Sequence, residues 1–232
     1  MKKITSVTVA ALTVGGLIAS VAPASAHPSA AALTKARATS IATAINLKSS
    51  DFPDYSVTPY QPSAQEKAED KRVAKCVGEQ PEFVDVTSAE FDNSDGYGFS
   101  SETSFVSSLA AVKTDARRAT SAHARSCFKQ ELQAAATEAG ASSAKVTVTP
   151  VHESAVSGLD AVFAMKFAVT FSVLGQNASL YGYDFGFGRG NAEVSLTEIG
   201  SADVPASAST QTLATLVSRA KHNVPAAGFK IA

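Results

Sequence analysis

The sequence contains no tryptophan, only two cysteines in 232 residues, and few charged residues, at 18% of the chain. Two cysteines are too few for a small disulfide-rich fold. The near balance of 20 basic and 21 acidic residues excludes a strongly basic nucleic-acid-binding protein. An apolar share of 45% excludes an intrinsically disordered chain. These absences leave a folded protein whose activity the composition does not name.

One long apolar run stands at the N-terminus, and it has the features of a signal peptide. Lys2 and Lys3 precede an uncharged stretch of apolar or small residues over 4–21. The following Ala24-Ser25-Ala26 matches the small-x-small pattern that a signal peptidase cuts. The sequence therefore predicts a signal peptide over residues 1–26, cleaved after Ala26. We expect a secreted protein, extracellular or associated with the cell wall, with no stable membrane span after cleavage.

The remaining residues, 27–232, show no internal repeat and no low-complexity linker, so we expect a single globular domain. Loss of the two N-terminal lysines changes the net charge from -1 to -3. Cys76 and Cys127 are expected to form a disulfide, because exported proteins fold in an oxidising environment. Their spacing excludes a redox Cys-x-x-Cys pair, and two cysteines are too few for structural zinc.

Helical patterns and alternating patterns divide the chain into a mainly helical first half and a β-rich second half. Helices are predicted over 30–46, 64–76, 109–139 and 207–223, the third of them as one helix or as two broken near Thr120-Ser121. Short extended pieces are predicted over 83–86 and 99–106, and a strand over 145–151. Alternating residues and two turns then predict a three-stranded meander over 160–173, 181–187 and 192–196.

Aromatic residues alternate along the first two strands of this meander, and we assign them to one face. The opposite face is then predicted to carry small residues, Ala164, Ala168, Gly182 and Gly186, which would let a helix approach closely. We therefore predict an α+β fold: an α/β/α sandwich with a mainly antiparallel sheet, the C-terminal meander within it, and helices on both faces. The alternative is a cone-shaped α+β barrel with a ligand cavity.

A series of short motifs carries a resemblance to a known family. Leu47-x-x-x-Asp51-Phe52-Pro53-x-Tyr55 is followed by Cys76-Val77-Gly78, by Cys127-Phe128 at the head of a helix, and by the meander and a last helix. With this order the chain resembles exported, often lipid-anchored actinobacterial proteins related to the extracellular sensor domain of PknH-type receptor kinases. The resemblance implies a PsbP-like α/β/α sandwich, a binding or sensing role at the cell envelope, and no catalytic constellation. We expect no cofactor.

Catalytic motifs are scarce. No Gly-x-Ser-x-Gly elbow occurs in the sequence. The adjacent pair His152-Glu153 follows a predicted strand, and His123 lies in a predicted helix. A dispersed serine–histidine site around either histidine is the enzymatic alternative, a secreted hydrolase.

A second candidate is a cation site in an acidic segment. Phe91-x-Asn93-x-Asp95-Gly96 with Glu102 follows the spacing of a calcium-binding loop, except that the first position is Phe91 and Asp92 is one residue out of register. A weak hard-cation site built from Asp92, Asp95 and Glu102 is the hypothesis; an acidic surface turn is the alternative.

A basic docking face is the third candidate. Several cations recur at multiples of four between residues 109 and 130, and they would form a stripe if this region were one helix. Such a stripe would bind acidic groups. Its residues are Lys113, Arg117, Arg118, Arg125 and Lys129.

Together these observations favour an exported, non-enzymatic binding or sensor-like domain of the cell envelope. The expected partner is a lipid or amphipathic envelope molecule, or an envelope protein. We expect no nucleic acid as partner, because the mature chain is acidic and its aromatic residues fit a core. A purely structural envelope protein without a small ligand is a further alternative.

Overall fold

The computed structural model describes residues 32–151, 157–173, 176–201 and 206–231. The expected signal peptide over 1–26 and the pair His152-Glu153 lie outside these residues. Within them, five α-helices and eight strands form an α+β fold with a mainly antiparallel sheet, as the sequence predicts. No helix of the described part of the chain is both long enough and apolar enough to cross a membrane.

All eight strands belong to one sheet, in the order β1-β3-β4-β8-β7-β6-β5, with β2 pairing β4 beside β3. Every pair of neighbouring strands is antiparallel. The sheet is open, with β1 and β5 at its two ends, so the alternative of a closed barrel is wrong. The strands are β1 Ser56–Thr58, β2 Glu82–Thr87, β3 Glu90–Asp92, β4 Tyr97–Val106, β5 Ser143–Pro150, β6 Ala161–Val173, β7 Gln176–Arg189 and β8 Ala192–Gly200.

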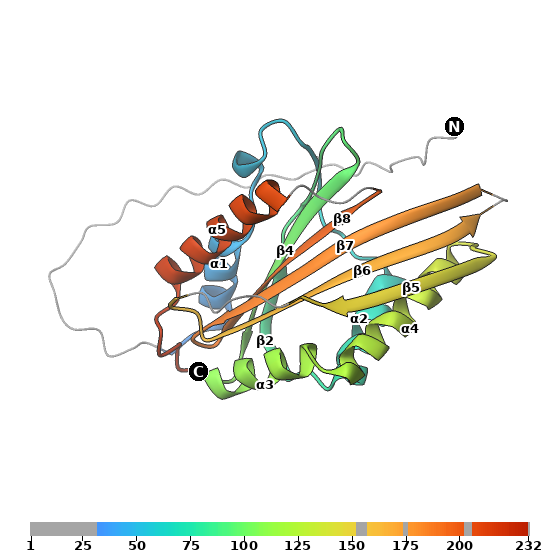
Figure 1. The fold of residues 1–232 in the computed structure, drawn as a ribbon. Helices are drawn as coiled ribbons and strands as arrows, with labels where there is room; N and C mark the ends of the chain where they lie inside the picture. Colours follow the sequence, from blue (N-terminus) through green and yellow to red (C-terminus); the bar gives the residue numbers. More distant parts are fainter. Residues whose placement is uncertain (1–31, 152–156, 174–175, 202–205, 232) are drawn as a thin grey trace, which may run out of the picture.

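Helices cover both faces of this sheet (Figure 1). On one face, α1 and α5 contact each other and the central strands β4 and β8. On the other face, α3 packs against β6 and β7, α4 packs against β5, and α2 packs against α4. The helices are α1 Lys35–Ile45, α2 Ala64–Val77, α3 Leu109–Ala119, α4 Ala122–Glu138 and α5 Ala206–Asn223, with a single 3₁₀ turn at Ser49–Asp51.

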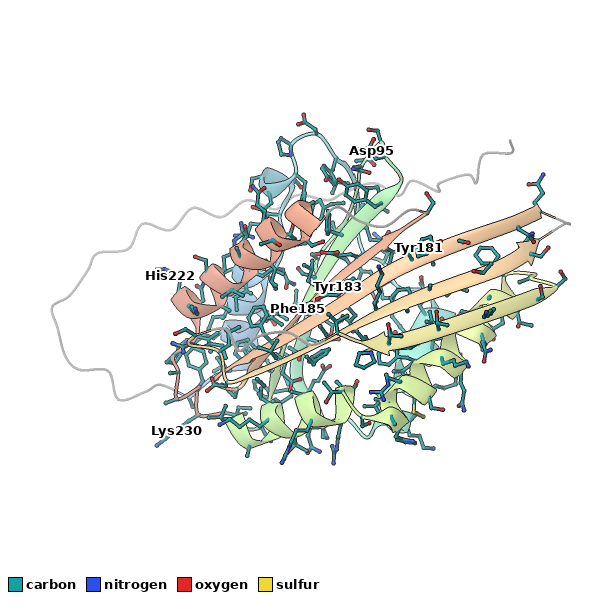
Figure 2. All side chains as sticks on the ribbon, viewed as in Figure 1. Asp95, Tyr181, Tyr183, Phe185, His222 and Lys230 are labelled. Carbon is teal, nitrogen blue, oxygen red and sulfur yellow. A yellow bond between two sulfur atoms is a disulfide. The ribbon has the colours of Figure 1, made fainter. Side chains whose placement is uncertain are left out.

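The main hydrophobic core lies between the sheet and the α1/α5 layer. Its members include Phe105 of β4, Phe185 of β7, Leu196 of β8, Ile45 of α1 and Leu216 of α5, each at most 1% exposed. Figure 2 shows the aromatic side chains that β7 carries, with Tyr181, Tyr183 and Phe185 labelled in succession along the strand. Among the described residues, the apolar clusters on the opposite face of the sheet are small, such as that of Val106, Ala111 and Val112.

The register between β6 and β7 corrects the prediction about the two faces. Phe163 lies opposite Gly186, whereas Phe185 lies opposite Ala164. Because directly paired residues of antiparallel strands share a face, the aromatic residues of β6 and those of β7 lie on opposite faces of the sheet. A Cβ added at Gly186 would lie 1.9 Å from the Phe163 ring. The glycine therefore admits an aromatic ring from the neighbouring strand, and not a helix.

A helix does approach the sheet closely at Gly188. A Cβ added there would lie 2.2 Å from Cγ1 of Val112 in α3. A small residue on β7 therefore does permit close packing of a helix, but at Gly188 and not at the four predicted positions.

The disulfide forms between the residues that the sequence predicts. Cys76 near the end of α2 is bonded to Cys127 of α4, with Cα atoms 6.0 Å apart. A side-chain hydrogen bond from Gln65 to Glu138 and an ion pair between Arg72 and Glu131 add to this link. Helix α2 lacks a large buried face of its own, with Val77 as its one fully buried residue, so these links hold α2 beside α4.

Candidate ligand-binding cavity

A cavity of about 850 Å³ lies between the sheet and the layer formed by α2, α3 and α4. Strands β2, β4, β6, β7 and β8 contribute its floor, and the three helices contribute its walls. Eight acidic side chains line it, and we call them the cavity carboxylates: Asp70, Glu79, Glu82, Asp85, Glu102, Asp115, Asp184 and Glu193. The lining cations are two lysines of α2, Lys67 and Lys71.

Strand register arranges the floor so that hydroxyls alternate with carboxylates. Ser104 of β4 lies between its pairing partners Asp85 of β2 and Glu193 of β8. One row further along, Glu102 of β4 lies between Thr87 and Ser195 in the same way. Directly paired residues share a face, so each row presents a carboxylate next to a hydroxyl.

The third row continues this pattern into β7 and β6. Thr197 of β8 pairs with Asp184 of β7, and Asp184 pairs with Met165 of β6. The Thr197 hydroxyl donates a hydrogen bond to Asp184, and the Thr87 hydroxyl donates one to Glu102 at 3.2 Å. The floor thus places an acidic group directly beside an apolar side chain.

An irregularity in β2 adds a further carboxylate to the cavity. Residues three apart in a regular strand point to opposite faces, which would separate Glu82 from Asp85. The register between β2 and β4 shifts between Glu82 and Val84, as in a β-bulge. The extra residue restores Glu82 to the cavity face, where its carboxylate lies within 4.8 Å of those of Asp85 and Glu102.

Partial burial and mutual repulsion make these groups hard to ionise, including Glu82, whose side chain remains exposed on one side. Burial, with the charges of Glu102 and Asp85, raises the pKa of Glu82 to about 7. Burial, with the charges of Asp115 and Glu82 among others, raises the pKa of Glu193 to about 8. Burial likewise raises the pKa of Asp184 to about 7. The floor therefore carries carboxyl groups that hold their protons near neutral pH.

Neutralising partners for the cavity carboxylates are few. In the part of the chain that the structure describes, their one ion pair joins Asp115 to Arg118, at 3.4 Å. Glu193 Oε1 is buried and has no hydrogen-bond partner within that part. An unpaired buried acceptor is unfavourable, so the site would gain from a donor supplied by a ligand.

One side of the cavity is apolar. Phe163 and Met165 of β6 line it from the sheet, and Val77, Val112 and Phe128 line it from the helical side. The cavity therefore combines a carboxylate-rich floor with an apolar wall, a combination suited to a molecule with a polar end and a hydrocarbon part.

The residues of the predicted calcium loop occupy a β-hairpin. Asp92 ends β3, Asp95 lies at the tip of the turn into β4 (Figure 2), and Glu102 is in the middle of β4. Asp95 is held by its neighbour, because its backbone N–H donates to Asn93 Oδ1 at 2.9 Å. Among the described residues, the carboxylates that lie near Glu102 are those of Glu82 and Asp85.

The basic residues are divided between two helices, because the chain breaks at Thr120-Ser121 into α3 and α4. Lys113, Arg117 and Arg118 lie on α3, and Arg118 also donates to the backbone oxygen of Gly78. Arg125 and Lys129 lie on α4, where Arg125 donates to the Thr120 carbonyl at 2.6 Å. Of the two interpretations of this region, the break into two helices is confirmed, so the condition for a continuous stripe on one helix is not met. The docking face itself remains a prediction.

His123 contacts the disulfide. Its Nε2 lies 2.9 Å from the backbone oxygen of Cys76 and 3.8 Å from the sulfur of Cys127. His123 therefore lies beside the disulfide between α2 and α4. Its partners are neither the serine hydroxyl nor the carboxylate that a serine–histidine site requires.

Of the cavity carboxylates, the sequence pointed only to Glu102, as part of the cation-site hypothesis. Glu79, Glu82 and Asp85 stand close together in an acidic stretch of the sequence, a signal that could have indicated them. Asp184 and Glu193 stand alone among apolar and small residues, and only the pairing of β4 with β8 and of β8 with β7 brings them to the same floor.

A scan against protein-family models finds no match, and a search of curated proteins finds none either. Among solved structures, the chain is similar to the crystal structure of the extracellular domain of PknH from Mycobacterium tuberculosis. The match covers 83% of this chain and 99% of that chain, with 9% identity and a TM-score of 0.44. The matched domain is of the type that the sequence motifs resemble.

Proposed function

We propose that this protein is an exported, non-enzymatic binding domain, and that it holds a small amphipathic molecule in the cavity between the sheet and helices α2, α3 and α4. The cavity itself is the observation that carries this proposal. Its volume of about 850 Å³ falls within the range of roughly 300–1,000 Å³ that small-molecule sites occupy. Its lining is mixed, with an apolar wall beside polar groups.

The disulfide supports both the export and the site. A bond between Cys76 and Cys127 fits an oxidising compartment outside the cytoplasm. It also joins α2, which forms one wall of the cavity, to α4. The disulfide therefore helps to keep this cavity wall in place, because the main hydrophobic core lies on the opposite face of the sheet.

Native mass spectrometry of the protein purified from its producing cells tests this function, with a denatured sample beside it. We expect an extra mass that is lost on denaturation. Ser195, on the cavity floor, offers a blocking variant, Ser195→Trp. Thr147→Trp is the matched control, because Thr147 is exposed on the neighbouring edge strand β5.

The control protein should keep the extra mass and the blocked protein should lose it. A wild-type mass equal to that of the bare chain would contradict a tightly held ligand. A Ser195→Trp protein that keeps the extra mass would show that the ligand binds elsewhere. A folded state for both variants is checked by circular dichroism.

A further inference from the structure

We propose that the molecule held in the cavity is an organic cation, with an ammonium or guanidinium group at the carboxylate floor and a hydrocarbon part along the apolar wall. This inference rests on the proposed function and names the chemical class of its ligand. It follows from three independent features of the cavity: its charge, an unpaired acceptor on its floor, and the position of its apolar side chains.

The charge of the lining favours a cation and opposes an anion. The eight cavity carboxylates face two lysines, Lys67 and Lys71, and a single ion pair with Arg118 neutralises one of the carboxylates within the described residues. A bound carboxylate or phosphate would add negative charge to a site that already disfavours its own ionisation. A bound cation would relieve this repulsion and allow the carboxyl groups to ionise.

The floor also offers an unused hydrogen-bond acceptor. Glu193 Oε1 is buried with no hydrogen-bond partner in the described part of the chain, on a strand whose neighbouring residues line the cavity. Ammonium and guanidinium groups carry several N–H donors, and their hydrogen bonds to carboxylates are among the strongest in proteins. A neutral hydrocarbon would leave this oxygen unpaired, which is unfavourable.

The apolar wall distinguishes an organic cation from a metal ion. Met165 pairs directly with Asp184, and Phe163 lies two residues away on the same face of β6. A hydrocarbon chain attached to an amine at Asp184 would therefore lie against these two side chains. A hard metal ion such as calcium would use oxygen ligands alone and leave most of the roughly 850 Å³ unfilled.

Isothermal titration calorimetry with three probes of equal chain length tests the inference: octylamine, 1-octanol and octanoate. The cation, the neutral alcohol and the anion share the same hydrocarbon, so their affinities differ through the head group. We expect octylamine to bind at least tenfold more tightly than 1-octanol, and octanoate to bind more weakly than either. Equal affinities for octylamine and 1-octanol would overturn the inference and leave the proposed cavity function standing.

Paired variants place the cation on the floor. Asp184→Asn combined with Glu193→Gln should weaken octylamine binding at least tenfold and leave 1-octanol binding within twofold. The matched control combines Asp54→Asn with Glu90→Gln at two exposed positions outside the cavity, and it should bind octylamine as the wild type does. Glu102→Gln alone, expected to weaken octylamine binding severalfold, serves as a second floor variant if the double variant does not fold.

Two outcomes separate failure of this inference from failure of the proposed function. Calcium chloride that binds at the floor, while octylamine does not, would replace the organic cation by a metal ion. Absence of binding by all three octyl probes, together with a bare wild-type mass in the native spectrum, would refute both the inference and the cavity function.

Discussion

Replacement of Glu193 by glutamine should make the stability of the fold less dependent on pH. The folded protein holds a proton on Glu193 up to a pKa of about 8, whereas an unfolded glutamate releases it near 4.3. Between these values the unfolded state binds fewer protons than the folded state, so the free energy of unfolding falls as the pH rises. This loss of unfolding free energy is absent at pH values below the pKa of Glu193 in the unfolded state. It is complete at pH values above the pKa of Glu193 in the folded state.

The expected loss of unfolding free energy depends on the range of pH over which unfolding can be measured. Each pH unit between the two pKa values removes about 1.4 kcal/mol of stability for one fully enclosed group. From pH 5.5 to 8.5 this gives an upper limit of roughly 3 kcal/mol, and water entering the cavity together with the neighbouring carboxylates lowers it to about 1–2 kcal/mol. Glu193→Gln removes this contribution, because an amide does not titrate.

Urea unfolding at pH 5.5 and at pH 8.5, followed by circular dichroism, measures the effect. Burial also raises the pKa values of Glu82, Asp184 and Glu198 to about 7, so wild-type stability should fall between the two pH values for several reasons. The informative quantity is the gap between Glu193→Gln and the wild type, which should grow by about 1–2 kcal/mol at the higher pH. For the control Asp54→Asn, at an exposed position, the difference in unfolding free energy from the wild type should be the same at both pH values. Parallel losses of stability in Glu193→Gln and wild type would refute the reasoning.

Two further predictions concern the helices around the cavity. Replacing both Cys76 and Cys127 by alanine opens a loop of 51 residues and should lower the free energy of unfolding in urea by about 4 kcal/mol. The backbone amides of α2 should also exchange hydrogen faster. Unchanged exchange would contradict the role of the disulfide in holding α2. Gly188→Ala should cost about 1–3 kcal/mol, because its Cβ would meet Val112 Cγ1 at 2.2 Å. Adding Val112→Ala should recover part of that loss, and strictly additive losses in the double variant would show that α3 does not pack on Gly188.

The sequence by itself determined most of the secondary structure in the second half of the chain. Alternation over 160–173, 181–187 and 192–196 predicted β6, β7 and β8, because a period of two interrupted by turn residues is typical of antiparallel strands joined by tight turns. In the structure, Gly190 of the second turn has a φ of 59°. Helix α5 followed from its apolar stripe. The pairing of Cys76 with Cys127 could be predicted, because two cysteines in an exported chain allow a single intramolecular disulfide.

The tertiary structure decided what the sequence could not: the faces of the sheet and the composition of the cavity. Alternation within a strand says which residues share a face, but register decides how the faces of neighbouring strands combine, and here it placed Phe163 over Gly186. Similarly, a bulge in β2 returned Glu82 to the side of Asp85.

Long-range pairing completed the candidate site. Ser104 and Glu193 became neighbours only when β4 paired with β8, and Asp184 joined them through β7. Local propensity gives no information about contacts between residues so distant in the chain, because the free energy that fixes them comes from closing the whole sheet and burying its core. The acidic residues were visible in the sequence, and their convergence on one cavity was a property of the fold alone.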